Sequence, residues 1–185
     1  MKKILFLAAM IVGTSAVYAQ NYKAFKVDVG FGYAIPSGGE KGGTKAGLTF
    51  TVEPHYRLSD DLALGLRFEG AALGRASNMN GIDADVKISA LNSYSATGEY
   101  YLNKTGFRPF VGAGVGLFNS ASVTMNAGTN GQGVIVPGAT KFGFIPNVGF
   151  ETGHFRMSAN YNLVSDNGYF AAKIGFFFGG GKKSI

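Results

Sequence analysis

Apolar and polar residues alternate strictly in the stretch AFKVDVGFGYAIP, residues 24–36. One set of alternate positions holds Phe25, Val27, Val29, Phe31, Tyr33 and Ile35, and the other holds Lys26, Asp28, Gly30, Gly32 and Ala34. Successive side chains of a strand point to opposite faces, so this period of two predicts an extended strand with one apolar and one polar face.

The same alternation recurs in seven later segments, at residues 49–58, 62–72, 86–102, 109–117, 141–152, 155–163 and 169–178. Short turns at 59–61, 103–107 and 153–154 alternate with long loops at 36–47, 73–85 and 119–140 and a shorter loop at 164–168. This order predicts an all-β fold, an eight-stranded antiparallel up-and-down barrel with two unlike ends. Asn92 on an apolar face suggests a bulge or a membrane edge. Period-two residues from 121 to 125 and at 134 and 136 predict that one hairpin continues beyond the barrel and turns at 128–133.

Alternation alone does not say which face is outside, because a soluble lipocalin-type barrel shows the same period. Charged residues make up 15% of the chain, against about 25% in ordinary soluble proteins. Within the predicted strands the charges all lie on the polar face; the acids are Asp28, Glu53, Glu69, Glu99 and Glu151, and the bases are Lys26, Arg57, Arg67, Lys87, Lys141, Arg156 and Lys173. Aromatic residues gather near both ends of the apolar face, as in the aromatic girdles of membrane barrels.

These features predict a transmembrane β-barrel with its apolar face toward lipid. A Lys or Arg on the lipid face costs up to ~2–4 kcal/mol near the midplane, and a few such charges would exceed the roughly 5–15 kcal/mol of a typical fold. The charges must therefore face the lumen. The barrel must also be closed, because lipid offers no hydrogen-bond partner to an open strand edge.

The first 19 residues, MKKILFLAAMIVGTSAVYA, have a basic start, a short apolar run and a small-x-small end. They predict a cleaved secretory signal peptide, followed by the barrel at 20–178 and a tail at 179–185. The predicted location is therefore the bacterial outer membrane. The net charge of +6 includes two lysines in the signal and two in the tail, so it gives no support to nucleic-acid binding.

The segment YYLNKTGFRPFVGAGVGLF, residues 100–118, resembles the strand-turn-strand signature of small bacterial outer-membrane barrels of the OmpA, OmpX and Opa type. The resemblance covers essentially the whole mature chain. It implies an eight-stranded barrel that ends on an aromatic residue read by the insertion machinery. Phe178 fits that pattern, although residues 179–185 follow it.

The interior of an eight-stranded barrel is just filled by side chains. Charges at similar depths are expected to pair there, because an unpaired buried charge is very costly. The predicted site is a structural cluster of lumen charges made of Glu53, Arg57, Arg67, Glu69, Glu99, Glu151, Arg156 and Lys173. A narrow or gated ion path is the functional alternative for the same residues.

Enzymatic function is not expected. No G-x-S-x-G motif occurs, and no serine is placed beside His55 by the sequence. GAGVG lies within a predicted strand with no helix after it, so it is not a nucleotide fingerprint. No cofactor, metal ligand cluster or catalytic residue is predicted.

Three functions stay open: a structural or surface-interaction barrel, a channel for small or apolar solutes of the OmpW type, and, least favoured, a lipid-modifying enzyme. The expected partners are outer-membrane lipid and lipopolysaccharide, together with an extracellular ligand if the long loops bind one. The protein is expected to be a monomer.

Overall fold

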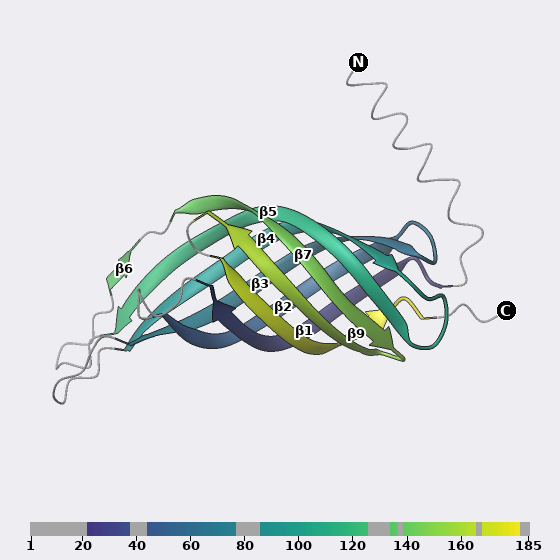
Figure 1. The fold of residues 1–185 in the computed structure, drawn as a ribbon, viewed down its shortest axis with the longest axis horizontal. Coiled ribbons are helices and arrows are strands. Elements are labelled where there is room, and N and C mark those ends of the chain that lie inside the picture. Colours follow the sequence, from purple (N-terminus) through teal and green to yellow (C-terminus); the bar gives the residue numbers. More distant parts are fainter. Residues whose placement is uncertain are drawn as a thin grey trace, which may run out of the picture.

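The computed structural model describes residues 22–37, 44–76, 86–125, 134–136, 139–165 and 168–181. In this part of the chain, nine strands form one antiparallel sheet (Figure 1). They are β1 (Phe25–Pro36), β2 (Thr44–Arg57), β3 (Leu62–Ala76), β4 (Val86–Tyr101), β5 (Arg108–Met125), β6 (Val134–Val136), β7 (Thr140–Thr152), β8 (Phe155–Val164) and β9 (Tyr169–Gly179). The described residues contain no helix long and apolar enough to cross a bilayer.

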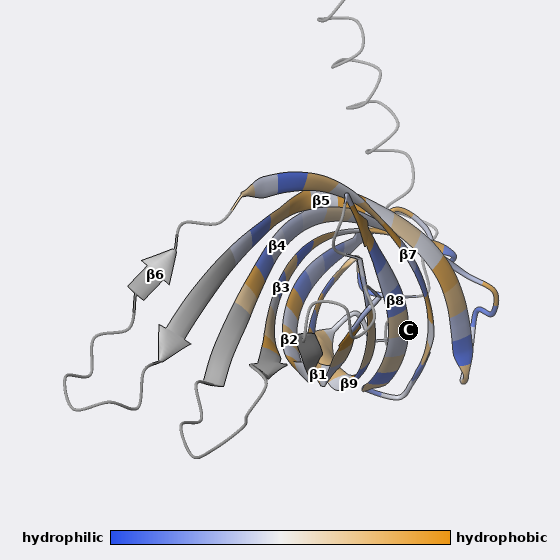
Figure 2. Cartoon of the chain, turned by 60° about the vertical axis from the view of Figure 1, so that its left-hand side comes forward, coloured by the Kyte–Doolittle hydropathy of each residue, from blue (hydrophilic) through white to orange (hydrophobic). Residues whose placement is uncertain are grey.

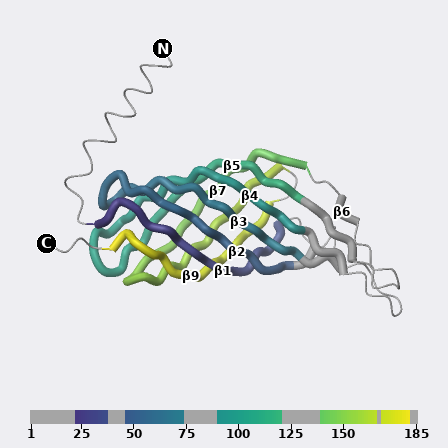
Figure 3. Tube along the Cα trace, turned by 180° about the vertical axis from the view of Figure 1, so that it is seen from behind, coloured from purple at the N-terminus to yellow at the C-terminus, as the bar shows by residue number. Residues whose placement is uncertain are grey.

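The sheet closes on itself. Each long strand pairs with its neighbours in the chain, and β1 pairs with β9 from Lys26↔Gly179 to Pro36↔Tyr169. The eight long strands therefore form a ring without a free edge, which confirms the predicted eight-stranded up-and-down barrel. Figure 3 shows the same ring from behind, with the strands strongly tilted to the long axis.

The two ends of the barrel differ as predicted. We call the end with the connections 57–62, 101–108 and 152–155 the turn end, and the opposite end the loop end. At the loop end, β5 continues to Met125 and pairs with the short β6, Ser122 opposite Val136. The hairpin extension predicted from the alternation is thus confirmed, whereas its predicted turn at 128–133 lies outside the described residues. Strand β3 also runs four residues further than the sequence indicated, to Ala76.

The outer surface is apolar over the whole width of the barrel. Leu48, Phe142 and Phe178 are each more than 60% exposed, although all three are large hydrophobic residues. Aromatic rings on neighbouring strands contact one another there, with Phe31 and Phe50 centroids 5.3 Å apart and Phe68 and Tyr94 centroids 5.7 Å apart. Along each strand the hydropathy alternates, as the striped strands of Figure 2 show. Such an exterior is suited to lipid acyl chains and not to water.

Two prolines interrupt the backbone ladder of the wall. Pairing of β2 with β3 is continuous up to Val52↔Phe68 and resumes at His55↔Gly65, so the positions at Glu53 and Pro54 lack partners in β3. Pairing of β7 with β8 is likewise missing at Ile145 and Pro146. Proline has no N–H to donate, which explains both gaps without any change of register.

The bulge considered at Asn92 does not exist. The register of β4 runs through Asn92 without a shift on both sides, opposite Gly70 in β3 and Asn119 in β5. The register shift that does occur lies between Lys45 and Gly47 of β2. Asn92 is exposed on the outer face toward the loop end, which fits the other interpretation, an edge of the apolar band.

The exposed leucines of β3 provide a test of the lipid-facing exterior. Leu66 and Leu62 both point outward, but Leu62 lies at the turn end and Leu66 four residues further into the wall. We expect Leu66→Arg to destabilise the barrel by ~2–4 kcal/mol and Leu62→Arg by ~0–1 kcal/mol, because the cost of a lipid-facing arginine rises with depth. Urea unfolding in phospholipid vesicles measures both, with alanine at each position as the reference. Equal costs at the two positions would contradict a lipid-facing wall.

Candidate functional site

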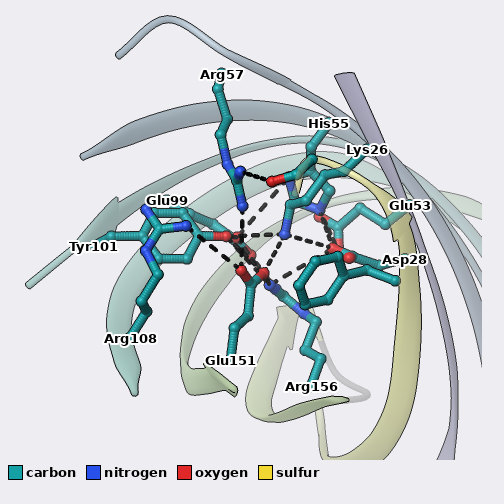
Figure 4. Close-up of polar contacts among 12 residues, drawn as sticks. Lys26, Asp28, Glu53, His55, Arg57, Glu99, Tyr101, Arg108, Glu151 and Arg156 are labelled. Atoms are coloured by element: carbon teal, nitrogen blue, oxygen red, sulfur yellow. Dashed lines mark hydrogen bonds and ion pairs between the residues drawn. The ribbon is translucent and has the colours of Figure 1, made fainter. Parts of the chain in front are cut away.

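The inward positions near the turn end carry a dense group of charged side chains. Because inward residues recur every second position, single strands contribute two or three of them, and the ring brings the strands together around one axis. This turn-end cluster consists of Lys26, Asp28, Glu53, His55, Arg57, Arg67, Glu99, Tyr101, Arg108, Glu151 and Arg156. Figure 4 shows ten of these side chains converging on the centre of the lumen from opposite walls.

Glu151 of β7 is the most heavily shared carboxylate. It accepts a hydrogen bond from Lys26 of β1, and its Oε1 lies 2.8 Å from the Tyr101 hydroxyl. Lys26 Nζ also donates to Tyr101 Oη at 2.9 Å, and Arg57 Nη2 donates to Glu151 Oε2 at 3.3 Å. The carboxylate of Glu151 thereby links β7 to side chains of β1, β2 and β4.

The side chain of Arg156, on β8, extends across the lumen to acidic residues of other strands. It forms an ion pair with Glu99 of β4, donates to Glu151 Oε1 at 2.7 Å and lies 3.5 Å from Asp28 Oδ2. Its guanidinium carbon is also 4.1 Å from the ring centroid of Phe110. This side chain is only 5% exposed, so its charge depends on these partners and not on water.

Glu53 and Arg67 join β2 and β3 at the gap left by Pro54. Arg67 Nε donates to Glu53 Oε2 at 2.9 Å, and the Thr97 hydroxyl donates to Glu53 Oε1 at 2.6 Å. Glu53 lies at the position where the β2–β3 backbone pairing is missing. A side-chain ion pair therefore links the two strands where the backbone ladder does not.

A second, smaller group lies nearer the loop end. This loop-end cluster is centred on Glu69, whose Oε2 accepts a hydrogen bond from Lys173 Nζ at 2.5 Å. The Tyr169 hydroxyl donates to Glu69 Oε1 at 2.7 Å, and Asn162 Nδ2 donates to the same oxygen at 3.3 Å. Strands β3 and β9, which are separated along the wall by β2 and β1, are thus joined through the lumen.

Beyond the loop-end cluster the interior becomes apolar. Its buried members are Ala34, Ala71, Leu73, Phe118, Ile145, Tyr169 and Ala171. The ring centroids of Phe118 and Tyr169 are 6.4 Å apart in an edge-on arrangement. Polar side chains therefore fill only part of the lumen, whereas the sequence analysis expected them to fill all of it. The prediction missed this apolar layer because it placed Leu73 in a loop and ended the next strand at residue 117, just before Phe118, while β3 and β5 continue through both positions.

Glycines on the inner face make room for the large side chains. A Cβ added to Gly112 would lie 2.2 Å from Asn147 Oδ1, and Asn147 Nδ2 donates to Glu99 Oε1 at 3.2 Å. A Cβ at Gly143 would likewise lie 2.6 Å from the Phe118 ring. Both glycines are thus required by the close approach of a neighbouring side chain.

All eight residues of the predicted lumen cluster are buried in the interior, each at most 5% exposed. Six of them lie in the turn-end cluster, and Glu69 and Lys173 form the separate loop-end cluster. Of the other predicted lumen bases, Lys141 donates to the Ser165 carbonyl at 3.0 Å. The side chain of Lys87 lies outside the described part of the structure.

Sequence reasoning missed Arg108 and gave no role to Tyr101. It left Arg108 unassigned between the turn at 103–107 and the strand at 109–117, but the residue begins β5 and faces inward like Phe110, two positions later. Extending the alternation by two positions would have found it. Tyr101 faces inward like Glu99, two positions before it. Its hydroxyl bonds with Lys26 of β1 and Glu151 of β7, and the sequence carries no signal for these contacts.

Within the described residues, three ligand-type side chains are grouped closely enough to hold a metal ion. These are Asp28, Glu53 and His55, with one possible ligand atom from each within 4.8 Å of the others. Their carboxylates are already occupied, because Asp28 Oδ2 lies 3.2 Å from Lys26 Nζ and Glu53 Oε2 accepts a hydrogen bond from Arg67. Neighbouring cations of this kind do not fit a site for a divalent metal.

A closed eight-stranded ring with an apolar exterior and a charged, filled interior has counterparts among known proteins. The family model described as "Outer membrane protein beta-barrel domain" matches residues 4–181. The chain belongs to this family. Among curated proteins, no match to this chain was found.

Solved structures of outer-membrane barrels share the fold. Neisserial surface protein A (NspA) is 15% identical, with a TM-score of 0.53 over 86% of this chain and 99% of that one. The outer membrane protein OprG from Pseudomonas aeruginosa is 13% identical, with a TM-score of 0.53 over 86% of this chain and 98% of that one. These likenesses show that the chain shares the fold of these barrels. Its outer-membrane location is supported by the family to which it belongs.

The central ion pair can be tested by a double-mutant cycle. Arg156→Met should cost ~3–5 kcal/mol, because it leaves Glu99 and Glu151 buried with one cation fewer. Adding Glu99→Gln should cost less than the sum of the single changes, with a coupling of about 0.5–3 kcal/mol. Urea unfolding in vesicles gives the four free energies.

The exposed pair Lys104–Asp61, with Nζ and Oδ2 3.3 Å apart at the turn end, is the matched control. Its coupling should be ~0–1 kcal/mol, as for other surface pairs. A Glu99–Arg156 coupling no larger than that of the control pair would show that the lumen charges do not depend on one another.

Proposed function

We propose that this outer-membrane barrel is a scaffold with a closed lumen, which acts through its lipid-facing and cell-surface parts and does not transport solutes. The observation that carries the proposal is the interior filling. Two ion-pair clusters and an apolar layer follow one another along the axis, each made of side chains from opposite walls. The cavity between the two clusters, lined by Asp28, Glu53, Arg156 and Lys173, measures about 20 Å³, which is room for about one water molecule.

The same arrangement supports a monomer in contact with lipid all round. Every long strand is paired on both sides, so the barrel wall itself leaves no edge to recruit a second copy. The apolar exterior is continuous with exposed residues such as Phe31, Leu66 and Ile174. We propose that lipid, with lipopolysaccharide in the outer leaflet, is the partner of this surface. Recognition of an extracellular ligand would fall to the long loops.

A narrow ion path is the second candidate function, and one observation favours it. A cavity of about 320 Å³ enters the barrel from the turn end and reaches Arg57, Arg108 and Glu151. A conducting path would have to continue past Arg156, the loop-end cluster and the apolar layer. It would therefore require the ion pairs on Glu69 and Glu99 to separate together.

Conductance across a planar bilayer distinguishes the two candidates. We expect the native protein to give only leak-level current in potassium chloride. Alanine replacement of the facing pair in both clusters, Glu99 with Arg156 and Glu69 with Lys173, together with Phe118 and Tyr169 of the apolar layer, should produce measurable current if the variant remains folded, as judged by its heat-modifiable migration in gels. The outer-face variant Leu66→Ala should behave like the native protein. Steady open channels in the native protein would refute the closed-lumen proposal.

A further inference from the structure

The outer wall of the barrel carries a row of polar side chains near the loop end. Asn92 of β4 lies opposite Asn119 of β5, and Asn119 lies opposite Thr140 of β7. On β3 the same row continues with Gly70, which has no side chain. We call Asn92, Asn119 and Thr140 the outer-face row. Asn92 and Thr140 are exposed, and Asn119 is partly exposed.

The side chains of the outer-face row present hydrogen-bonding groups to the outside. Thr140 Oγ1 donates to Asn119 Oδ1 at 2.5 Å, which leaves the Asn119 Nδ2 donors for other partners. A Cβ added to Gly70 would lie 3.5 Å from Asn92 Oδ1, so the Asn92 amide lies beside a bare part of the wall. An amide that faces acyl chains without a hydrogen bond is unfavourable. The row is therefore suited to a level of the membrane that offers hydrogen-bond partners.

The length of β5 places the row at the outer edge of the apolar band. Outward positions of β5 are apolar from Pro109 to Leu117, and Asn119 is the next outward position. The ten residue steps from Pro109 to Asn119 cover ~33 Å along the strand at about 3.3 Å each, and ~25 Å along the axis at a tilt of about 40°. The lipid-facing band of such barrels is also about 25 Å tall. Pro109 therefore lies at one face of the membrane and Asn119 at the other, where the acyl chains meet the lipid head groups.

The outer-face row is confined to one side of the barrel. On that side, strands β3, β4 and β5 continue beyond the row, to Ala76, Val86 and Met125. On β1, β2, β8 and β9 the outward residues near the loop end stay apolar and exposed; they are Ile35, Leu48, Leu163 and Phe170. A lipid head group can therefore form hydrogen bonds with side chains of the row but not with these apolar side chains.

The chemistry of the row favours a sugar over a phosphate. Amide and hydroxyl side chains donate and accept hydrogen bonds, as sugar hydroxyls and amide-linked acyl chains also do. Phosphates are typically bound by arginine and lysine, and neither residue belongs to the row. Lys141, next to Thr140 in the chain, belongs to the opposite face of β7 and donates to the Ser165 carbonyl. The row thus matches an uncharged, hydroxylated part of a lipid head group.

We propose that the outer-face row binds the sugar head of lipopolysaccharide where its acyl chains are attached. The loop end carries the longer connections, which face the outside of the cell in barrels of this kind. The inference rests on the proposed lipid-facing role of the wall, and it gives that role a defined position over β4, β5 and β7. It does not depend on the closed lumen, because the row lies on the other face of the same strands.

Unfolding in vesicles of defined lipid tests the site. The protein is refolded into phosphatidylcholine alone, into phosphatidylcholine with lipid A, which is the sugar head of lipopolysaccharide with its acyl chains, and into phosphatidylcholine with phosphatidylglycerol at the same surface charge. We expect lipid A to lengthen the half-time of unfolding in urea by roughly threefold or more, because a ligand that binds only the folded state stabilises it. Asn92→Leu combined with Asn119→Leu should fold in phosphatidylcholine, because leucine suits a lipid-facing wall, but should lose most of the gain from lipid A. No gain in the native protein, an equal gain in the variant, or an equal gain with phosphatidylglycerol would overturn the proposal.

Leu48→Ala is the matched control, because it changes an outward side chain near the loop end that is 71% exposed but lies on β2, away from the row. It should keep the gain from lipid A, and a loss as large as that of the leucine pair would contradict a site at the row.

If the leucine pair does not fold, the native protein decides. Lipid A in detergent micelles should then shift the side-chain amide signals of Asn92 and Asn119 but not that of Asn103 at the turn end. Unshifted signals at Asn92 and Asn119 would refute binding there. Such a failure is distinguishable from a failure of the closed lumen, because the leak-level current of the native protein is measured without lipid A.

Discussion

The pairing of charges inside the ring is the interaction on which the rest of this structure depends. Residues such as Glu99, Glu151 and Arg156 are almost fully buried, and a charge at that depth persists only with a partner of opposite sign. The partners come from opposite walls, as with Lys26 of β1 and Glu151 of β7. The pairs can therefore form only when the ring is closed, and a closed ring of this size is stable only when its interior is filled. Closure of the ring and filling of its interior therefore depend on each other.

The interior changes character from one end of the barrel to the other. At the turn end a cavity reaches Arg57 and Arg108, next come the ion pairs around Glu99, and then the group centred on Glu69. At the loop end Phe118 and Tyr169 close the interior with apolar contacts. The cavity at the turn end therefore reaches charged residues, whereas the described inward residues at the loop end are apolar.

The wall and the interior compensate for each other. Pro54 interrupts the hydrogen-bond ladder between β2 and β3, and the Glu53–Arg67 ion pair joins those two strands at the same level. Gly112 leaves the wall without a side chain, and Asn147 occupies the space and bonds to Glu99. Proline and glycine weaken a strand. At Pro54 and Gly112, inward side chains provide contacts where the wall lacks them.

Much of this arrangement could be read from the period of two. Alternation in residues 24–36 and in seven later segments predicted the strands, the meander and the inward position of residues such as Glu53 and Arg156, because adjacent side chains of a strand must point to opposite faces. It also predicted the extension of β5 and its pairing with β6. It failed where strands run past their predicted ends, as at Leu73 and Phe118, and where a strand begins one residue early, as at Arg108.

The sequence by itself determined which face of each strand is enclosed, since a charge on the lipid face would cost more free energy than the fold can supply. Only the tertiary structure decided which enclosed residues meet. Strand tilt and register set the depth of each side chain along the axis, and no local pattern encodes them. That is why Glu69 is separated from Glu99 and why Glu151 is shared among cations from three strands, β1, β2 and β8.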